Sequence, residues 1–405
     1  MNKSNINVVA YIMAGGEGKR LRPLTNDRAK PAVPFAGMYR IIDFVMTNLY
    51  NSGVHKIVLL TQYKPASLSR HIQQGYLPVF SSLGRFLEPR QSSKQQYKAT
   101  ADSVFQNLDV LSREHFDIVD VFGADHIYRM NVTQMHDLHL NKKADVTISV
   151  MPVNIDDATR FGIVAVDKEG RIIKFEEKPT NPTPMPSDPN KYLASMGNYS
   201  FNPQTLEEVL KDQPRDRMQF DFGKYVIPKM IRDKRKVFAY DFSKNYIEGF
   251  TPEEVTYWRD VGTISDFYKA NMDLLGENPV LKLQLRNWRM LTNVESTYPS
   301  RGAERVLIAD YILANGAWLH DEAVVKSSVI SYNVEVKNGA EVLESIMLGH
   351  TEVGEGAIIR KSIIDRWNKI PPDTIIGVDK ALDRKRKFSV DGDITTVPRG
   401  HFPFK

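Results

Sequence analysis

The chain has 405 residues, of which 42% are hydrophobic and 25% charged, and its formal net charge at pH 7 is +5. This length favours two domains, and this composition is typical of a soluble globular protein. Because the chain contains no cysteine, disulfide bonds, thiolate metal ligands and cysteine nucleophiles are excluded.

The sequence gives no sign of a membrane or a nucleic acid as a partner. No apolar run approaches membrane-spanning length, and the N-terminal apolar run leads into a glycine-rich loop without a cleavage site. We therefore expect a cytoplasmic protein. The modest positive charge suits small anionic substrates, and no long basic tract favours nucleic acid.

The first predicted element is a buried strand, Val8 to Met13, which a glycine-rich loop follows. Glycines at 15, 16 and 18 allow a tight turn that can aim several backbone N–H groups at one anion. Lys19, Arg20 and Arg22 add positive charge at the same place. The loop predicts a site for more than one phosphate; the alternative is a glycine-rich turn with solvated cations.

The spacing of this loop excludes two common phosphate loops. The Walker pattern needs a glycine five residues before its Gly-Lys pair, where this chain has Met13. The dinucleotide fingerprint needs a third glycine where Leu21 stands.

The first 150 residues alternate between helix and strand patterns, with Gly53 placed to end the first helix. Helical spacing predicts two helices and short apolar runs predict three further strands: 40–51 and 102–112, then 56–60, 118–122 and 146–153. Alternation favours a parallel sheet covered on both faces, with ligands at the carboxyl ends of its strands. Because the glycine loop and Asp125 both follow strands, we expect them to face one crevice.

Two segments, Ser81–Thr100 and Thr180–Lys191, are predicted to be loops, the first because it is polar and the second because it contains four prolines. Loops of this length are either functional lids or surface decoration. His136 and His139 form an i, i+3 pair on a predicted helix, and we expect a solvated helix face there rather than a metal site.

The C-terminal quarter carries an apolar residue at every sixth position. One series is unbroken and a second resumes in a shifted phase: Ile312, Trp318, Val324, Ile330, Val336, Val342 and Leu348, then Ile358, Ile364, Ile370 and Ile376. A hexapeptide period with short turns is typical of a β-helix. We predict a hexapeptide-type domain over 305–405 that joins subunits, after a first domain over 1–290. An irregular sheet is the alternative.

Ordered motifs then run along nearly the whole chain: AGGEGKRLRPLT at 14–25, RAKPAVPF at 28–35, YRIIDF at 39–44, NSG at 51–53, TQY at 61–63, YKATADS at 97–103, GADHIYRM at 123–130, FGIVAVD at 161–167, FEEKP at 175–179, SMGNY at 195–199, DFGK at 221–224 and YWRDVGT at 257–263. Together they resemble the bacterial type of glucose-1-phosphate adenylyltransferases, also called ADP-glucose pyrophosphorylases. The glycine loop is shared by many sugar nucleotidyltransferases, whereas YWRDVGT, SMGNY and RAKPAVPF are more specific.

The resemblance implies an α/β catalytic domain with a doubly wound, mostly parallel sheet of the nucleotide-diphospho-sugar transferase type. A left-handed parallel β-helix for assembly and regulation follows it. The implied reaction is ATP + α-D-glucose 1-phosphate ⇌ ADP-glucose + diphosphate, for glycogen or starch-like glucan synthesis. The sugar phosphate is already ionised, so in-line attack on the α-phosphorus needs no general base; it needs positioning and charge neutralisation, which Mg²⁺ assists.

The resemblance also assigns residues. The implied catalytic residues are Arg20, Asp125, Lys178 and Asp260, of which the two aspartates hold Mg²⁺. The implied ATP site is Ala14, Gly15, Gly16, Gly18, Arg20, Lys30 and Gln62. The implied glucose 1-phosphate site is Tyr97, Gly162, Glu177, Lys178 and Ser195. Some of these residues also have an ordinary structural interpretation: Lys178 as a solvated surface lysine, Tyr97 as a core residue, Ser195 as a cap, and an aspartate at a strand end as a cap or turn residue.

The chain departs from many relatives at three positions. Ala99 and Ala124 stand where many relatives have glycine, so each adds a methyl group close to substrate. Asp27 stands where some relatives carry a lysine for a phosphorylated activator, and its carboxylate should repel such a ligand, fructose bisphosphate in particular. Arg28 and Arg40 stay candidates for contacts to other phosphorylated metabolite effectors. The resemblance and the stacking face imply a homotetramer.

Three alternatives remain open. The first is a nucleotidyltransferase for another base or sugar, against which the specific C-terminal motifs argue. The second is a non-catalytic regulatory subunit, which would be expected to have lost some of the four implied catalytic residues. The third is a hexapeptide acyltransferase, which leaves the N-terminal motifs unexplained.

Overall fold

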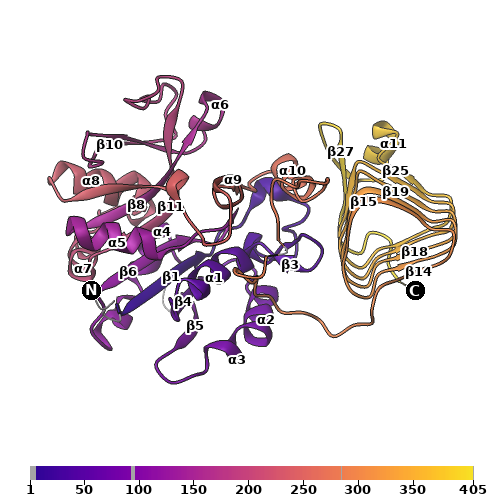
Figure 1. Ribbon diagram of the computed structural model, residues 1–405, viewed down its shortest axis with the longest axis horizontal. Coiled ribbons are helices and arrows are strands. Elements are labelled where there is room, and N and C mark those ends of the chain that lie inside the picture. The colour runs from indigo at the N-terminus through magenta and orange to yellow at the C-terminus, as the bar shows by residue number, and fades with distance from the viewer. Residues whose placement is uncertain (1–5, 93–95, 284, 405) are drawn as a thin grey trace.

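The computed structural model describes residues 6–92, 96–283 and 285–404. An N-terminal α/β part and a C-terminal β-helix lie side by side along the long axis of the molecule (Figure 1). The described residues between α10 (Ile264–Met272) and β14 (Arg301–Gly302) form no helix or strand. The domain boundaries at 290 and 305 fall in and just after this connection and stay a prediction.

Within the described residues, a nine-stranded sheet forms the centre of the N-terminal part. Its main path is β10 (Ile172–Glu177), β9 (Gly162–Val166), β11 (Tyr192–Phe201), β6 (Ile118–Gly123), β1 (Val8–Ala14), β4 (Lys56–Thr61) and β5 (Phe86–Gln91), while β8 (Val146–Val153) pairs with β11 and with β12 (Val237–Asp241). Strands β6, β1, β4 and β5 run parallel, and β11 is antiparallel to its neighbours. The predicted fold class is confirmed, and the carboxyl ends of β1, β4 and β6 share one edge.

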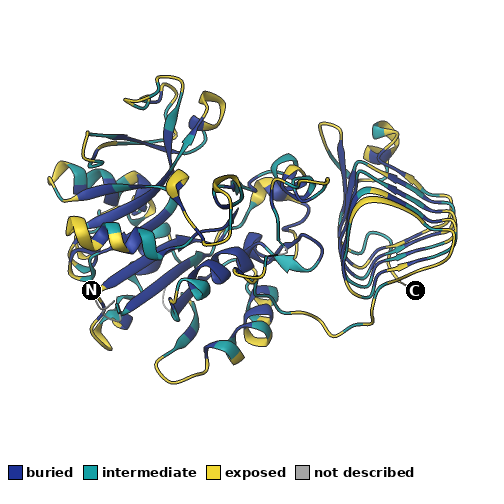
Figure 2. Cartoon of the chain, viewed as in Figure 1, coloured by how far each residue is buried: buried dark blue, intermediate teal, exposed yellow. Residues whose placement is uncertain are grey.

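The side chains of β1 alternate between two apolar cores, one on each face of the sheet. Ala10 and Ile12 pack with α1 (Ile42–Asn51) and α2 (Ala66–Gly75). Val9 and Tyr11 pack with α7 (Pro203–Lys211) and α8 (Ile227–Arg232). Figure 2 shows the strand buried along its length. A strand held on both faces gives the glycine loop after it a rigid base.

The remaining elements of the N-terminal part are short. The helices are α3 (Leu77–Phe80), α4 (Thr100–Phe105), α5 (Thr133–Lys142), α6 (Ile155–Ala158) and α9 (Pro252–Val255). Two small antiparallel pairs are formed: β2 (Pro34–Phe35) with β3 (Tyr39–Arg40), which are close in the sequence, and β7 (His126–Tyr128) with β13 (Trp258–Asp260), which are far apart in it. No described helix is long and apolar enough to cross a bilayer.

Two sequence predictions about local structure are wrong. The segment 81–100 contains strand β5, whose polar residues Glu88 and Arg90 suit the edge of a sheet, where it pairs with β4 alone among the described strands. The predicted helix 102–112 is α4 followed by a separate 3₁₀ turn, Leu108–Ser112. The proline-rich segment 180–191 forms no helix or strand, as predicted.

The prediction of a solvated face at His136 and His139 is also wrong, because both residues are buried in the core. His136 Nε2 lies 2.9 Å from a carboxylate oxygen of Asp120, and His139 Nδ1 lies 3.0 Å from Thr147 Oγ1. These partners give each buried imidazole a hydrogen-bonding group inside the interface between sheet and helix.

The C-terminal part is a parallel β-helix, as predicted. One sheet stacks β14, β16 (Trp318–Leu319), β18 (Glu335–Val336), β21 (Glu352–Val353) and β24 (Lys369–Ile370). The other strands are β15 (Leu307–Leu313), β17 (Val324–Ile330), β19 (Glu341–Leu343), β20 (Ile346–Met347), β22 (Ile358–Arg360), β23 (Ser362–Ile364), β25 (Ile375–Ile376), β27 (Ile394–Val397) and the antiparallel β26 (Ser389–Asp391), with α11 (Lys380–Lys385) near the end.

Each coil of the β-helix takes 17 residues, since Val325 pairs with Val342, which pairs with Ile359. Three hexapeptides would take 18 residues, one more than a coil. Residues at a strict spacing of six therefore shift by one position in each coil and do not all point into the interior. Trp318 is 38% exposed on the outside, and Leu348 packs toward the N-terminal part instead. The period therefore predicts the architecture but not every interior residue.

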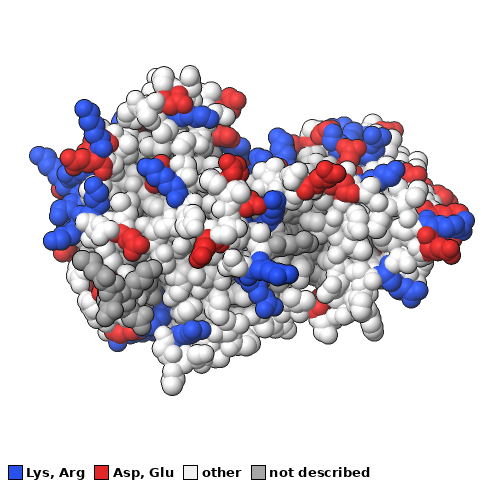
Figure 3. All heavy atoms as spheres, viewed as in Figure 1, with Lys and Arg blue, Asp and Glu red and all other residues white. Residues whose placement is uncertain are grey.

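An apolar core joins the two parts. Phe35 and Phe267 of the N-terminal part pack in one cluster with Val329, Ile346 and Ile363 of the β-helix. On the outer surface, cationic and anionic side chains are interspersed over both parts (Figure 3).

Candidate active site

The glycine loop lies at the carboxyl ends of the parallel strands. Gly18 has a φ of +65°, in the left-handed region. A Cβ atom at Gly18 would lie 3.0 Å from Lys30 Cβ and 3.2 Å from Thr25 Cγ2. Both the conformation and the space therefore require glycine at this position. Thr25 Oγ1 fixes the loop by donating a hydrogen bond of 2.9 Å to the Gly18 carbonyl.

A cavity of about 560 Å³ opens beside this loop, a volume suited to a nucleotide. Its lining includes Gly15, Gly16, Gly18, Arg20, Lys30, Gln62, Tyr97, Thr100, Asp125 and Gly262. Two hydrogen bonds fix Gln62 and Tyr97 to each other in the wall of this cavity: Tyr97 N donates to Gln62 Oε1 (2.6 Å), and Gln62 Nε2 donates to the Tyr97 carbonyl (3.2 Å).

A second cavity of about 280 Å³ adjoins the first. Arg20, Thr100 and Asp125 line both. The further lining of the smaller cavity includes His126, Arg160, Gly162, Glu177, Lys178, Ser195, Asp221 and Asp260. The two cavities thus form one cleft with charged groups at its middle.

The aspartates predicted to hold a metal converge through one strand pair. Asp125 lies between β6 and β7, and Asp260 ends β13. Strands β7 and β13 are antiparallel, and their register sets Asp260 opposite His126. This pairing brings together carboxylates that are 135 positions apart in the sequence.

Lys30 lies between the two carboxylates. Its buried Nζ is 3.0 Å from Asp125 Oδ2 and 3.0 Å from Asp260 Oδ1. Burial alone would lower the pKa of Lys30, but the two carboxylates outweigh burial and the pKa is raised. Burial alone would raise the pKa of Asp125, but Lys30 and then His126 outweigh it and the pKa falls well below its usual range. Both partners are therefore charged at neutral pH.

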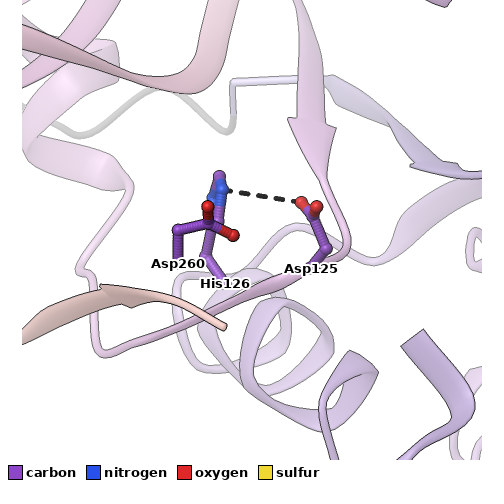
Figure 4. Close-up of side chains that lie close together, drawn as sticks. All are labelled: Asp125, His126 and Asp260. Carbon is purple, nitrogen blue, oxygen red and sulfur yellow. Dashed lines mark ion pairs between the residues drawn. The ribbon is translucent and has the colours of Figure 1, made fainter. Parts of the chain in front are cut away.

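These residues fit a divalent cation. Ligand atoms of Asp125, His126 and Asp260 all lie within 4.8 Å of one another (Figure 4). The two carboxylates offer the hard oxygen ligands that Mg²⁺ prefers. The imidazole lies beside them, with Nε2 3.5 Å from Asp125 Oδ1.

The smaller cavity carries the remaining predicted residues. A Cβ atom at Gly162 would lie 2.6 Å from the Phe175 ring and 3.2 Å from Glu177 Oε2, so glycine leaves room for both side chains. Burial raises the pKa of Glu177. Lys178 has a φ of +49° and is 62% exposed, with Nζ 3.7 Å from Glu177 Oε1.

Most of the predicted site residues line this cleft in the structure, but the positions of two of them differ from the prediction. Ala14 is buried in a core beneath the sheet and is not among the described residues that line either cavity. Tyr97, predicted with the sugar phosphate site, lines the larger cavity.

Sequence reasoning missed a pair that links the two cavities. Thr100 Oγ1 donates a 2.7 Å hydrogen bond to Asp221 Oδ2, and Asp221 Oδ1 accepts from the backbone N–H groups of Gly223 and Lys224. Thr100 lies inside the motif YKATADS and Asp221 inside DFGK, so the two motifs were the only indication in the sequence that these residues belong to the site. Their pairing depends on tertiary structure across 121 positions and could not be seen in the sequence.

The fold and the cleft together define a class of protein, the nucleotidyl transferases. Residues 9–277 match the family model described as nucleotidyl transferase, and residues 297–397 match the model described as the GlmU-like C-terminal hexapeptide.

Comparison with curated proteins narrows this class. A protein of Vibrio parahaemolyticus named glucose-1-phosphate adenylyltransferase 1 is 40% identical over 97% of this chain and 98% of its own length. Proteins named glucose-1-phosphate adenylyltransferase from Corynebacterium jeikeium and Geobacter metallireducens are 41% and 40% identical, over 98% and 95% of this chain and the same shares of their own lengths. The chain belongs to the glucose-1-phosphate adenylyltransferase family.

Proposed function

We propose that this chain catalyses ATP + α-D-glucose 1-phosphate ⇌ ADP-glucose + diphosphate and so supplies ADP-glucose for glycogen or starch-like glucan synthesis. The observation that carries the proposal is the single cleft, in which a nucleotide-sized cavity and a smaller one adjoin at Arg20 and Asp125. Identity of about 40% over nearly the whole chain to proteins named for this activity supports it.

The reaction needs two anions to approach each other in a fixed geometry. The attacking phosphate oxygen is already ionised, so the residues supply alignment and charge rather than a general base. Arg20 and the backbone of the glycine loop neutralise the β- and γ-phosphates of ATP, since a guanidinium suits two phosphate oxygens at once. Lys178 binds the phosphate of the sugar substrate, and Glu177 accepts hydrogen bonds from sugar hydroxyls.

Asp125 and Asp260 would hold the metal ion, which we propose is Mg²⁺. When bound there, Mg²⁺ supplies charge neutralisation at the reacting phosphates. Lys30 keeps both carboxylates ionised and close together, because its ammonium lies 3.0 Å from each.

We propose that phosphorylated effectors bind a cavity of about 770 Å³ between the N-terminal part and the β-helix. Arg40, Arg70, Arg366 and Arg399 line it. Burial, and then the Arg366 charge, lowers the pKa of Arg40 to about 10, so an anion there would relieve repulsion between cations. Asp27 also lines this cavity, in keeping with the expected rejection of fructose bisphosphate. Arg28, the other candidate, is only 1% exposed and is bound to Asp365, so it is not accessible to an effector.

We propose a cytoplasmic homotetramer, since ATP is an intracellular substrate and the β-helix offers stacking surfaces. Light scattering should give four times the 46.2 kDa mass of one chain. A monomeric mass at micromolar concentration would reject the assembly without touching the catalytic proposal.

One assay tests the proposed reaction. Diphosphate release is measured with glucose 1-phosphate and Mg²⁺ for ATP, UTP, GTP, CTP and dTTP in turn. We expect clear preference for ATP. A preference for UTP or dTTP would assign the chain to another branch of the nucleotidyl transferases, and no release with any of them would support a non-catalytic subunit.

A further inference from the structure

Arg160 lies in the smaller cavity and has no part in the mechanism above. It stands between α6 and β9, one residue before Phe161, whose carbonyl accepts a 3.1 Å hydrogen bond from Lys178 N. That bond holds the backbone around Arg160 next to Lys178. The Arg160 side chain is 34% exposed, so its guanidinium can meet a ligand in the cavity.

One carboxylate orients the guanidinium. Arg160 Nη2 donates a 2.6 Å hydrogen bond to Asp266 Oδ2, near the start of α10. Asp266 is itself fixed, because Thr263 Oγ1 donates to the same oxygen at 2.8 Å and accepts from Asp266 N at 3.1 Å. Among the described residues, hydrogen bonds engage one of the five side-chain N–H groups of Arg160. The planar fork is therefore held in place with donors to spare.

The charge in this cavity calls for a further cation. A sugar phosphate brings about two negative charges into it. Four carboxylates line the cavity, namely Asp125, Glu177, Asp221 and Asp260. The ammonium of Lys30 offsets part of the charge of Asp125 and Asp260, because it lies 3.0 Å from each. Among the described lysines and arginines that line the cavity itself, Arg160 is a third cation beside Arg20 and Lys178. Lys178 is 62% exposed, so solvent weakens its attraction for a phosphate.

We propose, resting on the function above, that Arg160 is a second phosphate-binding residue for the sugar phosphate. Asp266 positions the guanidinium, and the N–H groups it leaves free donate to phosphate oxygens while Lys178 acts as a point charge beside it. A guanidinium can bridge a carboxylate and a phosphate because its donors point in several directions. Arg160 thereby adds selectivity for a phosphorylated sugar.

The competing explanation is a brace: the Arg160–Asp266 pair could serve only to tie the segment before β9 to α10. The two explanations separate in paired variants. In Arg160→Gln the cation is lost, whereas in Asp266→Asn the ion pair is lost and the cation stays. Asp157→Asn is the matched control, since its carboxylate lies 3.6 Å from Arg160 Nη1 on the exposed side.

The experiment is steady-state kinetics of the full chain with each substrate varied in turn. We expect Arg160→Gln to raise the KM for glucose 1-phosphate about tenfold, with the KM for ATP within about twofold of the wild type. Asp266→Asn should raise the sugar phosphate KM by less than about threefold, Asp157→Asn should leave it unchanged, and Arg160→Lys should recover part of the loss.

Equal effects of Arg160→Gln and Asp266→Asn, or equal rises in both KM values, would show a brace and overturn the proposal. An unchanged sugar phosphate KM in Arg160→Gln would overturn it too. In all these cases the wild type still makes ADP-glucose, so the proposed function survives. A wild type that does not use glucose 1-phosphate would instead refute the proposed function.

Discussion

Arg28 and Asp365 form a two-pronged ion pair between the N-terminal part and the β-helix, across 337 positions of sequence. Arg28 Nη1 lies 3.0 Å from Asp365 Oδ1 and Nη2 lies 3.1 Å from Oδ2, and both side chains are 1% exposed. Because both side chains are buried, removing one partner leaves the charge of the other uncompensated.

We expect Arg28→Ala and Asp365→Ala each to destabilise the chain by about 3–5 kcal/mol, because a buried charge without its partner is costly. The double variant Arg28→Met/Asp365→Leu should recover much of this loss, since it removes both charges and keeps apolar volume. Thermal midpoints of the four proteins give the comparison. Single variants as stable as the wild type would mean that the pair does not help to hold the two parts together.

This ion pair marks the limit of what the sequence predicts. Local signals sufficed for the glycine loop after β1 and for the coils of the β-helix, because each depends on neighbours or on a short period. Lys30 bridging Asp125 and Asp260 depends on the β7–β13 register, and no local pattern encodes it. The burial of His136 likewise depends on Asp120, which tertiary contact places beneath the helix.

Gly18 and Gly16 offer a matched pair of substitutions. Gly18→Ala should lower activity at least tenfold, because the new methyl group would lie 3.0 Å from Lys30 Cβ and the residue would be strained at a φ of +65°. A methyl group at Gly16 meets no described atom within 4 Å and requires no left-handed backbone, so Gly16→Ala should retain more activity. The ATP KM and kcat of both variants check this; the reverse order would contradict the proposed loop geometry.

Asp125→Asn should fold normally and lose activity by about 10²–10³-fold, the usual loss when one preorganised electrostatic group is removed. The amide is isosteric but cannot neutralise Lys30 or bind a divalent cation well. Isothermal titration with Mg²⁺ and a kcat measurement in saturating Mg²⁺ test it together. Near-normal turnover and unchanged Mg²⁺ affinity would remove Asp125 from the metal site.

His139 makes stability depend on pH. Burial chiefly lowers its pKa from 6.5 to about 4, against a smaller opposing effect of Asp120. The unfolded chain therefore takes up the proton at higher pH than the folded one. The contribution of neutral, buried His139 to the free energy of unfolding is fully present above about pH 6.5. About 2–4 kcal/mol of that free energy is lost as the pH falls toward 4. Denaturation midpoints between pH 4 and 7 should fall more steeply for the wild type than for His139→Gln. Parallel curves would mean that another group controls this acid sensitivity.

Lys178→Ala should act on the sugar phosphate and not on ATP. The residue follows β10 and lines the smaller cavity. In the proposed function its ammonium would face the phosphate of the sugar substrate in both ground and transition states. Loss of such uniform binding raises KM and leaves kcat nearly unchanged. Because Lys178 is 62% exposed, we expect the KM for glucose 1-phosphate to rise about 10- to 100-fold, toward the lower part of the range for buried charge pairs.

Lys174→Ala is the matched control for Lys178→Ala. Lys174 lies on β10, the strand that Lys178 follows, and its side chain is 56% exposed and pairs with Glu176 at 2.8 Å. Lys174 is not among the described residues that line either cavity. Its loss should leave both KM values within about twofold, as for most surface substitutions. Should Lys178→Ala instead raise the ATP KM while the sugar phosphate KM stays put, Lys178 would belong to the nucleotide site. The assignment of the smaller cavity to the sugar phosphate would then be wrong.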